Sequence, residues 1–129
     1  MTLVTCDTHA LIFWALTPDR LGLRAAEALV PGRCACADIV LWEIGLLAAK
    51  GRIQLPVSTE VFLQDLVLGL ALKVLPITPR IASLTQDCRF SHGDPADRLI
   101  AATAIDHGWP LVSKDELLAK VDGLKLIWG

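Results

Sequence analysis

Long hydrophobic runs are missing from this sequence. Among its 129 residues, the longest stretch without Asp, Glu, Lys or Arg covers eleven residues, 8–18. A membrane-spanning helix needs about 20 consecutive apolar residues, and a secretory leader carries basic residues that the first positions lack. We therefore expect a protein that is neither exported nor inserted in a membrane, and that works in the cytoplasm.

Excess positive charge and closely paired cysteines are also missing. Twelve Lys and Arg face fourteen Asp and Glu, which gives a formal net charge of −2. A protein that binds nucleic acid through its bulk charge is basic, so any such contact here must be local. Cys34 and Cys36 are two positions apart, which is not the CxxC spacing of a zinc or redox site. We expect the cysteines to be small buried side chains.

Short apolar segments alternate with helical patterns along the chain. The apolar fraction of 53% excludes intrinsic disorder, and a chain of this length can bury its own core as one domain, 1–129. Strands separated by helices are typical of a parallel sheet covered on both faces. We predict a single α/β domain with a central parallel sheet of four to five strands flanked by helices. The expected strands cover residues 2–6, 33–37, 73–76, 111–113 and 124–128, and the expected helices cover 8–16, 17–30, 38–50, 58–69, 79–86 and 94–107.

Two of these helices have recognisable details. In the 17–30 segment, Leu23, Ala26 and Val30 recur at helical spacing. Asp38 stands where it can cap the N-terminus of the helix that follows.

Acidic residues follow two of the expected strands. Asp7 comes directly after the first strand, and Asp115 lies just beyond the fourth in the segment LVSKD. In open parallel sheets, ligands bind outside the carboxyl ends of the strands. A single Asp at such a place commonly caps the next helix, so each acid alone carries little weight.

Glu43 is an acid inside an almost wholly apolar helix, IVLWEIGLLAA. Helical spacing places it between Ile39 and Leu47 on an apolar face. An ionised carboxylate there is unfavourable unless it is paired or binds a metal. The alternatives are a salt bridge, with Lys50 or Arg52 as partner, and partial exposure at the edge of the helix.

The segment HGDPADRLIAATA places two acids at the start of a helix. Asp94 fits the N-cap, Pro95 the first helical position and Asp97 the third. A variant of the capping box explains this pattern fully, but one acid is enough for a cap. The dipole of the helix favours an ionised Asp97.

The four acids Asp7, Glu43, Asp97 and Asp115 come from segments that this topology can bring together. Two carboxylates ~6 Å apart repel by about 3 kcal/mol at an effective dielectric near 20, so such a cluster needs a cation. An all-oxygen ligand set without Cys or His favours Mg²⁺ or Mn²⁺ over Zn²⁺. The natural chemistry of that site is metal-dependent hydrolysis of a phosphodiester bond, with a metal-activated water as nucleophile.

Four segments in order, CDTHALIFW, LWEIGLLAAKGRI, HGDPADRLIAATA and LVSKD, make the chain resemble the PIN domain family. More narrowly, it is similar to the VapC-type ribonuclease toxins of bacterial toxin–antitoxin pairs. The resemblance implies an RNA substrate, a homodimer and a small antitoxin protein as partner. One departure is Ala96, where many relatives have a bulky aromatic residue. Carried over by position, the metal ligands would be Asp7, Glu43, Asp97 and Asp115, with Ser113 near the metal and Asp94 as a less essential acid.

Several other side chains are candidates for contact with a partner. Four basic residues have two interpretations: they form a rim that positions RNA phosphates, or they are ordinary solvated charges. They are Lys50, Arg52, Arg98 and Lys114. His9 and His92 each lie two residues from an acid, and their contact with substrate stays open. The apolar Phe13, Leu16 and segment 61–72 predict a partner surface.

Two other functions compete with a nuclease. A receiver-like phospho-signalling domain also has an acidic Mg²⁺ pocket in a parallel sheet, and Asp38 would be its phosphoacceptor. The chain lacks the early acid pair of such a pocket. A decayed nuclease that only binds a partner is the other alternative, and the four intact acids argue against it.

Overall fold

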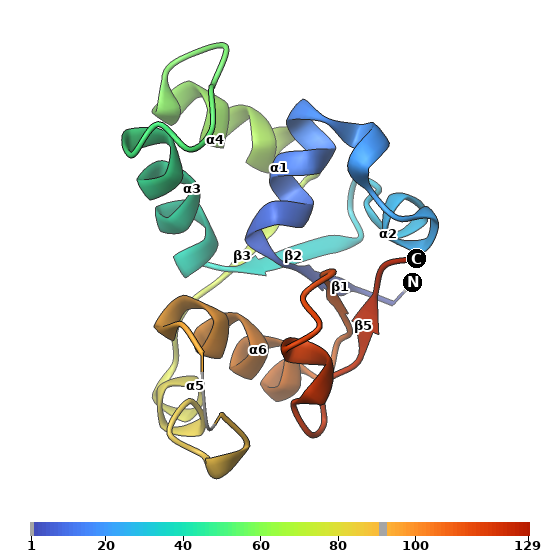
Figure 1. The fold of residues 1–129 in the computed structure, drawn as a ribbon, viewed down its shortest axis with the longest axis vertical. Coiled ribbons are helices and arrows are strands. Elements are labelled where there is room, and N and C mark those ends of the chain that lie inside the picture. The colour runs from blue at the N-terminus through green and yellow to red at the C-terminus, as the bar shows by residue number, and fades with distance from the viewer. Residues whose placement is uncertain (1, 91–92) are drawn as a thin grey trace.

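A computed structural model of the chain describes residues 2–90 and 93–129 (Figure 1). His92 lies outside the described residues. The strands are β1 (Val4–Cys6), β2 (Cys34–Ala37), β3 (Lys73–Leu75), β4 (Leu111–Val112) and β5 (Leu126–Ile127). The α-helices are α1 (Thr8–Leu16), α2 (Leu23–Ala28), α3 (Ile39–Ala49), α4 (Thr59–Gly69), α5 (Pro79–Leu84) and α6 (Pro95–His107), and three short 3₁₀ helices are η1 (Pro18–Arg20), η2 (Cys88–Phe90) and η3 (Leu118–Lys120).

The five strands form one sheet in the order β3-β2-β1-β4-β5, and every pairing is parallel. The helices α1 to α4 lie on one face of the sheet and α5 and α6 on the other (Figure 1). Because both faces are covered, the central strands are buried throughout, as in the CACA segment of β2. This arrangement confirms the predicted α/β fold, and it puts the carboxyl ends of β1 and β4 side by side.

The predicted helix over 17–30 is wrong as a single element. It is divided into η1 and α2, because the chain end crosses the segment at Gly22. A Cβ at Gly22 would lie 2.2 Å from the Trp128 carbonyl oxygen, and the Ala25 amide donates to that oxygen at 2.9 Å. The inner face of α2 also differs from the predicted one. The buried residues are Ala25, Ala28 and Leu29, whereas Leu23, Ala26 and Val30 are exposed.

Asp38 does not cap α3 with its side chain. Its backbone is already helical, with φ −59° and ψ −30°. The side chain instead accepts a hydrogen bond from the Ile77 amide at 3.2 Å, which ties the start of α3 to the loop after β3. In the described ranges, no helix is long and apolar enough to cross a membrane.

Candidate metal centre

The carboxyl edge of the sheet fixes Asp7 between two neighbouring strands. The Asp7 amide donates to the Val112 carbonyl of β4 at 3.0 Å. One carboxylate oxygen accepts from the Thr8 amide at 2.8 Å, and the other accepts from the Ser113 hydroxyl at 2.6 Å. The Ser113 oxygen in turn accepts from the Asp115 amide at 3.1 Å. Ser113 therefore connects the two acids that follow β1 and β4.

Glu43 reaches the same edge from α3, which packs against the core through its buried residues Val40 and Ile44. The hydroxyl of Thr8, a buried residue, donates a hydrogen bond to the Glu43 carboxylate. Neither of the salt bridges expected as alternatives, with Lys50 or Arg52, is present in residues 2–90 and 93–129. Thr8 is a site residue that the sequence analysis missed. Its position directly after Asp7, at the first turn of an apolar helix, was the available signal.

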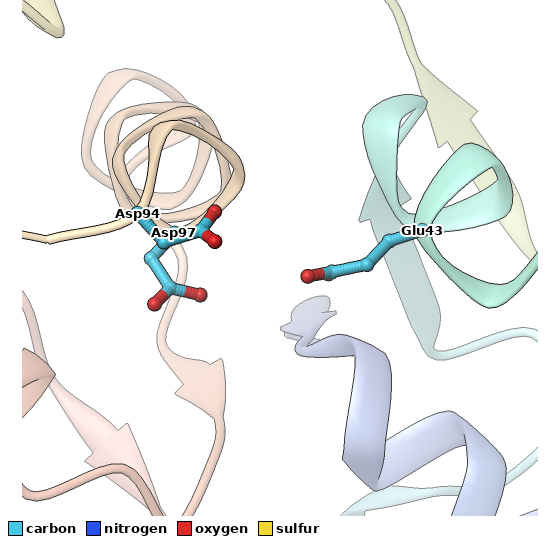
Figure 2. Close-up of side chains that lie close together, drawn as sticks. All are labelled: Glu43, Asp94 and Asp97. Carbon is cyan, nitrogen blue, oxygen red and sulfur yellow. The ribbon is translucent and has the colours of Figure 1, made fainter. Parts of the chain in front are cut away.

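The closest group of acids in the described part of the chain is Glu43, Asp94 and Asp97. One carboxylate oxygen from each lies within 4.8 Å of the others. Figure 2 shows Glu43 pointing from α3 toward the N-terminal end of α6, where the other two side chains lie. Asp94 also caps α6, because it accepts from the Ala96 amide at 2.7 Å. Asp94, expected as a supporting acid, thus lies within 4.8 Å of Glu43, as Asp97 does.

Crowding changes the protonation of these acids. Burial, followed by the charges of Asp7, Asp94, Glu43 and Asp115, raises the pKa of Asp97 from 3.8 to about 7. Without a cation, burial and the neighbouring carboxylates together therefore outweigh the helix dipole that the sequence analysis expected to keep Asp97 ionised. Burial also raises the pKa of Asp7 and of Glu43, although hydrogen bonds from Ser113 and Thr8 oppose the rise.

The donor atoms and the charge of the site match what a divalent metal ion requires. The oxygens of three carboxylates converge from two helices, and two further acids act on them by charge. A divalent cation relieves the repulsion that raises the pKa of Asp97. The donors are hard oxygens, which suit cations of the Mg²⁺ type. The residues present therefore fit a divalent metal ion.

The acids lie in an open groove with a volume of about 1360 Å³. Its walls include the five acids described above, a sixth acid, Glu116, the Ser113 hydroxyl, and the basic residues His9, Arg20, Arg52 and Lys114. Of the four predicted RNA contacts on Lys and Arg, Arg52 and Lys114 line this groove. Lys50 is exposed at the end of α3 and does not line it. Arg98 does not line the groove either. It lines a second, small cavity to which Asp97 and Asp115 also contribute, and its Nε has no hydrogen-bond partner among the described residues.

Phe13 is not part of an open apolar surface, contrary to the sequence-based expectation. Its exposed fraction is 4%, because it lies in the floor of the groove beneath charged side chains. The segment 61–72 does present apolar side chains to solvent, such as Leu68 with an exposed fraction of 79%.

Comparisons with known proteins agree with this architecture. Ribonuclease VapC22 of Mycobacterium tuberculosis is 41% identical over 120 residues, which are 92% of this chain and 91% of that protein. The solved structure of VapBC2 from Rickettsia felis, bound to a DNA fragment from their promoter, has a TM-score of 0.73 at 16% identity and covers 99% of this chain and 100% of that chain. A toxin–antitoxin complex from Klebsiella pneumoniae has a TM-score of 0.67 at 22% identity and covers 94% of each chain. A model of the PIN domain family matches residues 4–124. The chain belongs to the PIN domain family.

Proposed function

We propose that this chain, as one nuclease domain over residues 1–129, is a metal-dependent endoribonuclease that hydrolyses RNA phosphodiester bonds. The observation that carries the proposal is the convergence of Glu43, Asp94 and Asp97 within 4.8 Å in an open groove. The 41% identity to a protein named a ribonuclease supports RNA as the substrate.

In this proposal, the four predicted ligands hold Mg²⁺ or Mn²⁺, namely Asp7, Glu43, Asp97 and Asp115. Asp94, whose carboxylate lies within 4.8 Å of those of Glu43 and Asp97, supports them. Such a cation supplies an activated water and neutralises the charge that develops during hydrolysis. The protein's own side chains provide the geometry. Ser113 orients Asp7, and Thr8 orients Glu43, by the hydrogen bonds described above. Basic residues line the groove beside the acids, where they can attract the phosphates of an RNA strand.

The biological role that fits this chemistry is the toxin of a type II toxin–antitoxin pair. A relative named VapC22 and a similar fold in a toxin–antitoxin complex support that role. We propose a small antitoxin protein as partner, a homodimer as the assembly, and the cytoplasm, where RNA is available, as the place of action.

The receiver-like alternative fits less well. Asp38, its expected phosphoacceptor, does not line the acidic groove and is bound to the Ile77 amide. The other alternative is a decayed nuclease that only binds a partner. An activity test distinguishes it from an active nuclease.

The test is Glu43→Gln, with Glu27→Gln as the matched control on the exposed surface of α2. We expect Glu43→Gln to fold, because it keeps the volume of the side chain and a hydrogen bond with Thr8, but to cleave RNA at under about one-hundredth of the wild-type rate. Glu27→Gln should cleave at the wild-type rate. Full activity of Glu43→Gln would refute the assignment, and an inactive wild type in Mn²⁺ would favour the decayed nuclease.

A further inference from the structure

Two cations that the acidic site does not use lie against one aromatic ring in the same groove. The Arg20 guanidinium carbon lies 4.3 Å from the centroid of Phe13, and the Lys114 ammonium nitrogen lies 5.0 Å from it. Arg20 comes from η1 and Lys114 from the loop after β4, so segments far apart in sequence deliver the two charges. Such a convergence is a property of the fold and not of local sequence.

The ring that carries these cations is firmly held. Phe13 is buried, with an exposed fraction of 4%, and the Trp128 ring meets it edge-on at 6.2 Å between centroids. A fixed aromatic face attracts cations and limits where they can move. Phe13 therefore holds the Arg20 and Lys114 charges at 4.3 and 5.0 Å from the centre of one ring, although both side chains are exposed to solvent.

Among the residues that the structure describes, neither cation forms an ion pair with an acid. In the described ranges, the ion pairs are Arg80–Asp106 and Arg89–Asp87, and neither involves Arg20 or Lys114. Two like charges held against one ring without an anion form a site that an anion would complete. Both residues line the groove that also holds the five acids.

The chain itself connects this cation pair to the acidic centre. Lys114 stands between Ser113, which binds Asp7, and Asp115. On the other side, Phe13 is on the helix that begins directly after Asp7, so its Cα lies about 9 Å further along the helix axis. An anion bound over Phe13 would therefore be a neighbour of a group bound at the acids.

We propose that Arg20 and Lys114, held over Phe13, form a subsite for an RNA phosphate that flanks the scissile one. This rests on the proposed function, in which the acids and their metal take the scissile phosphate. RNA fits better than an acidic protein segment, because its charges repeat at every linkage. Binding one phosphate at the metal then delivers the next one along the strand to a fixed place. Arg20 is a binding residue that the sequence analysis did not single out.

A binding experiment tests the subsite without requiring cleavage. Affinity for a fluorescein-labelled oligouridylate is measured by anisotropy at several salt concentrations, in Mg²⁺, on the inactive Glu43→Gln background. Adding Arg20→Gln should weaken binding about tenfold at low salt. It should also lower the slope of log affinity against log salt by about 0.7, the value for one phosphate contact of a single strand. Arg24→Gln, which removes an exposed charge outside the groove, is the control and should change neither quantity.

A second variant guards against a general loss of structure. Phe13→Leu keeps both charges and an apolar floor but removes the aromatic face. If the subsite is correct, it weakens binding while a thermal melt still shows a cooperative transition. Equal salt slopes for Arg20→Gln and its parent would overturn the subsite, as would unchanged oligouridylate affinity in Phe13→Leu.

A cleavage experiment tests where the phosphate lies. An RNA that the active protein cuts at one place is made with a single neutral methylphosphonate at each linkage in turn. One flanking linkage should slow wild-type cleavage about tenfold and should have little effect in Arg20→Gln. If no linkage shows this coupling, the flanking position is wrong. If the wild type cuts no RNA but the salt slope still changes, the proposed function fails while the anion subsite stands.

Discussion

The most informative perturbation of the acidic centre is Asp97→Asn. Asp97 lies within 4.8 Å of Glu43 and Asp94 through its nearest oxygen. At that distance two unit charges repel by about 3 kcal/mol at an effective dielectric near 20, and by about 1 kcal/mol in water. Since Asp97 is half-buried, solvent screening favours the lower value. The cap of α6 is Asp94, so the substitution leaves the helix start intact.

We expect Asp97→Asn to raise Tm in EDTA at pH 8 by about 4 °C, which is what ~1 kcal/mol produces in a chain of this size. The effect should depend on pH. The pKa of Asp97 is about 7 in the fold and 3.8 ordinarily. The unfolded chain therefore ionises first, and the metal-free fold loses stability as the pH rises from about 4 to 7. The substitution removes that loss, so wild type and variant should differ less at pH 5 than at pH 8.

Manganese should reverse the order of the two proteins. At 100 times its dissociation constant, a cation stabilises the fold by about 2.7 kcal/mol, and the variant should lose most of that shift. Asp65→Asn, at an exposed position on α4, is the control and should keep the wild-type Mn²⁺ shift. Scanning fluorimetry measures all three proteins. Equal Mn²⁺ shifts in wild type and Asp97→Asn, or a lower Tm of the variant in EDTA, would refute the shared-site reasoning.

Two further substitutions test the residues that orient the acids. Ser113→Ala removes the hydroxyl that donates to Asp7 at a buried position. In urea titrations in EDTA, the free energy of unfolding should fall by about 1–2 kcal/mol. An unchanged free energy of unfolding would contradict the role given to Ser113. Thr8→Val removes the hydroxyl that donates to Glu43, and this loss raises the pKa of Glu43 further. The substitution should weaken Mn²⁺ binding about tenfold, as measured by a thermal-shift titration. Wild-type Mn²⁺ affinity in Thr8→Val would show that this hydrogen bond does not orient the site.

The fold was predictable where local signals and packing agree. The helix over 8–16 ends as predicted, because Asp7 starts it and Pro18 follows it closely. The 17–30 segment was not predictable, because its division depends on Trp128, more than a hundred positions away in sequence. Only the folded chain brings those backbones together.

In the candidate site too, the features set by local sequence were predictable and those set by long-range contacts were not. Its acids were found from the sequence, since each is anomalous in its local setting: Glu43 on an apolar helix, and Asp97 beyond the need for a cap. Which acids lie closest was not predictable, because that depends on how α3 and α6 face each other across the edge of the sheet. Arg20 was missed for a similar reason, because its significance comes from the ring of Phe13 and not from its neighbours in sequence.

The most direct test of the central claim is the chemistry of the cut ends. An end-labelled RNA is digested with and without EDTA, and its new termini are examined with phosphatase and with a test for cyclic phosphate. In the proposed hydrolysis, the nucleophile that attacks phosphorus is a water molecule. The reaction therefore does not need the 2′-hydroxyl of the RNA. We therefore predict a 5′-phosphate, a 3′-hydroxyl and no cleavage in EDTA. A 2′,3′-cyclic phosphate, or cleavage that EDTA does not affect, would contradict metal-dependent hydrolysis at this site.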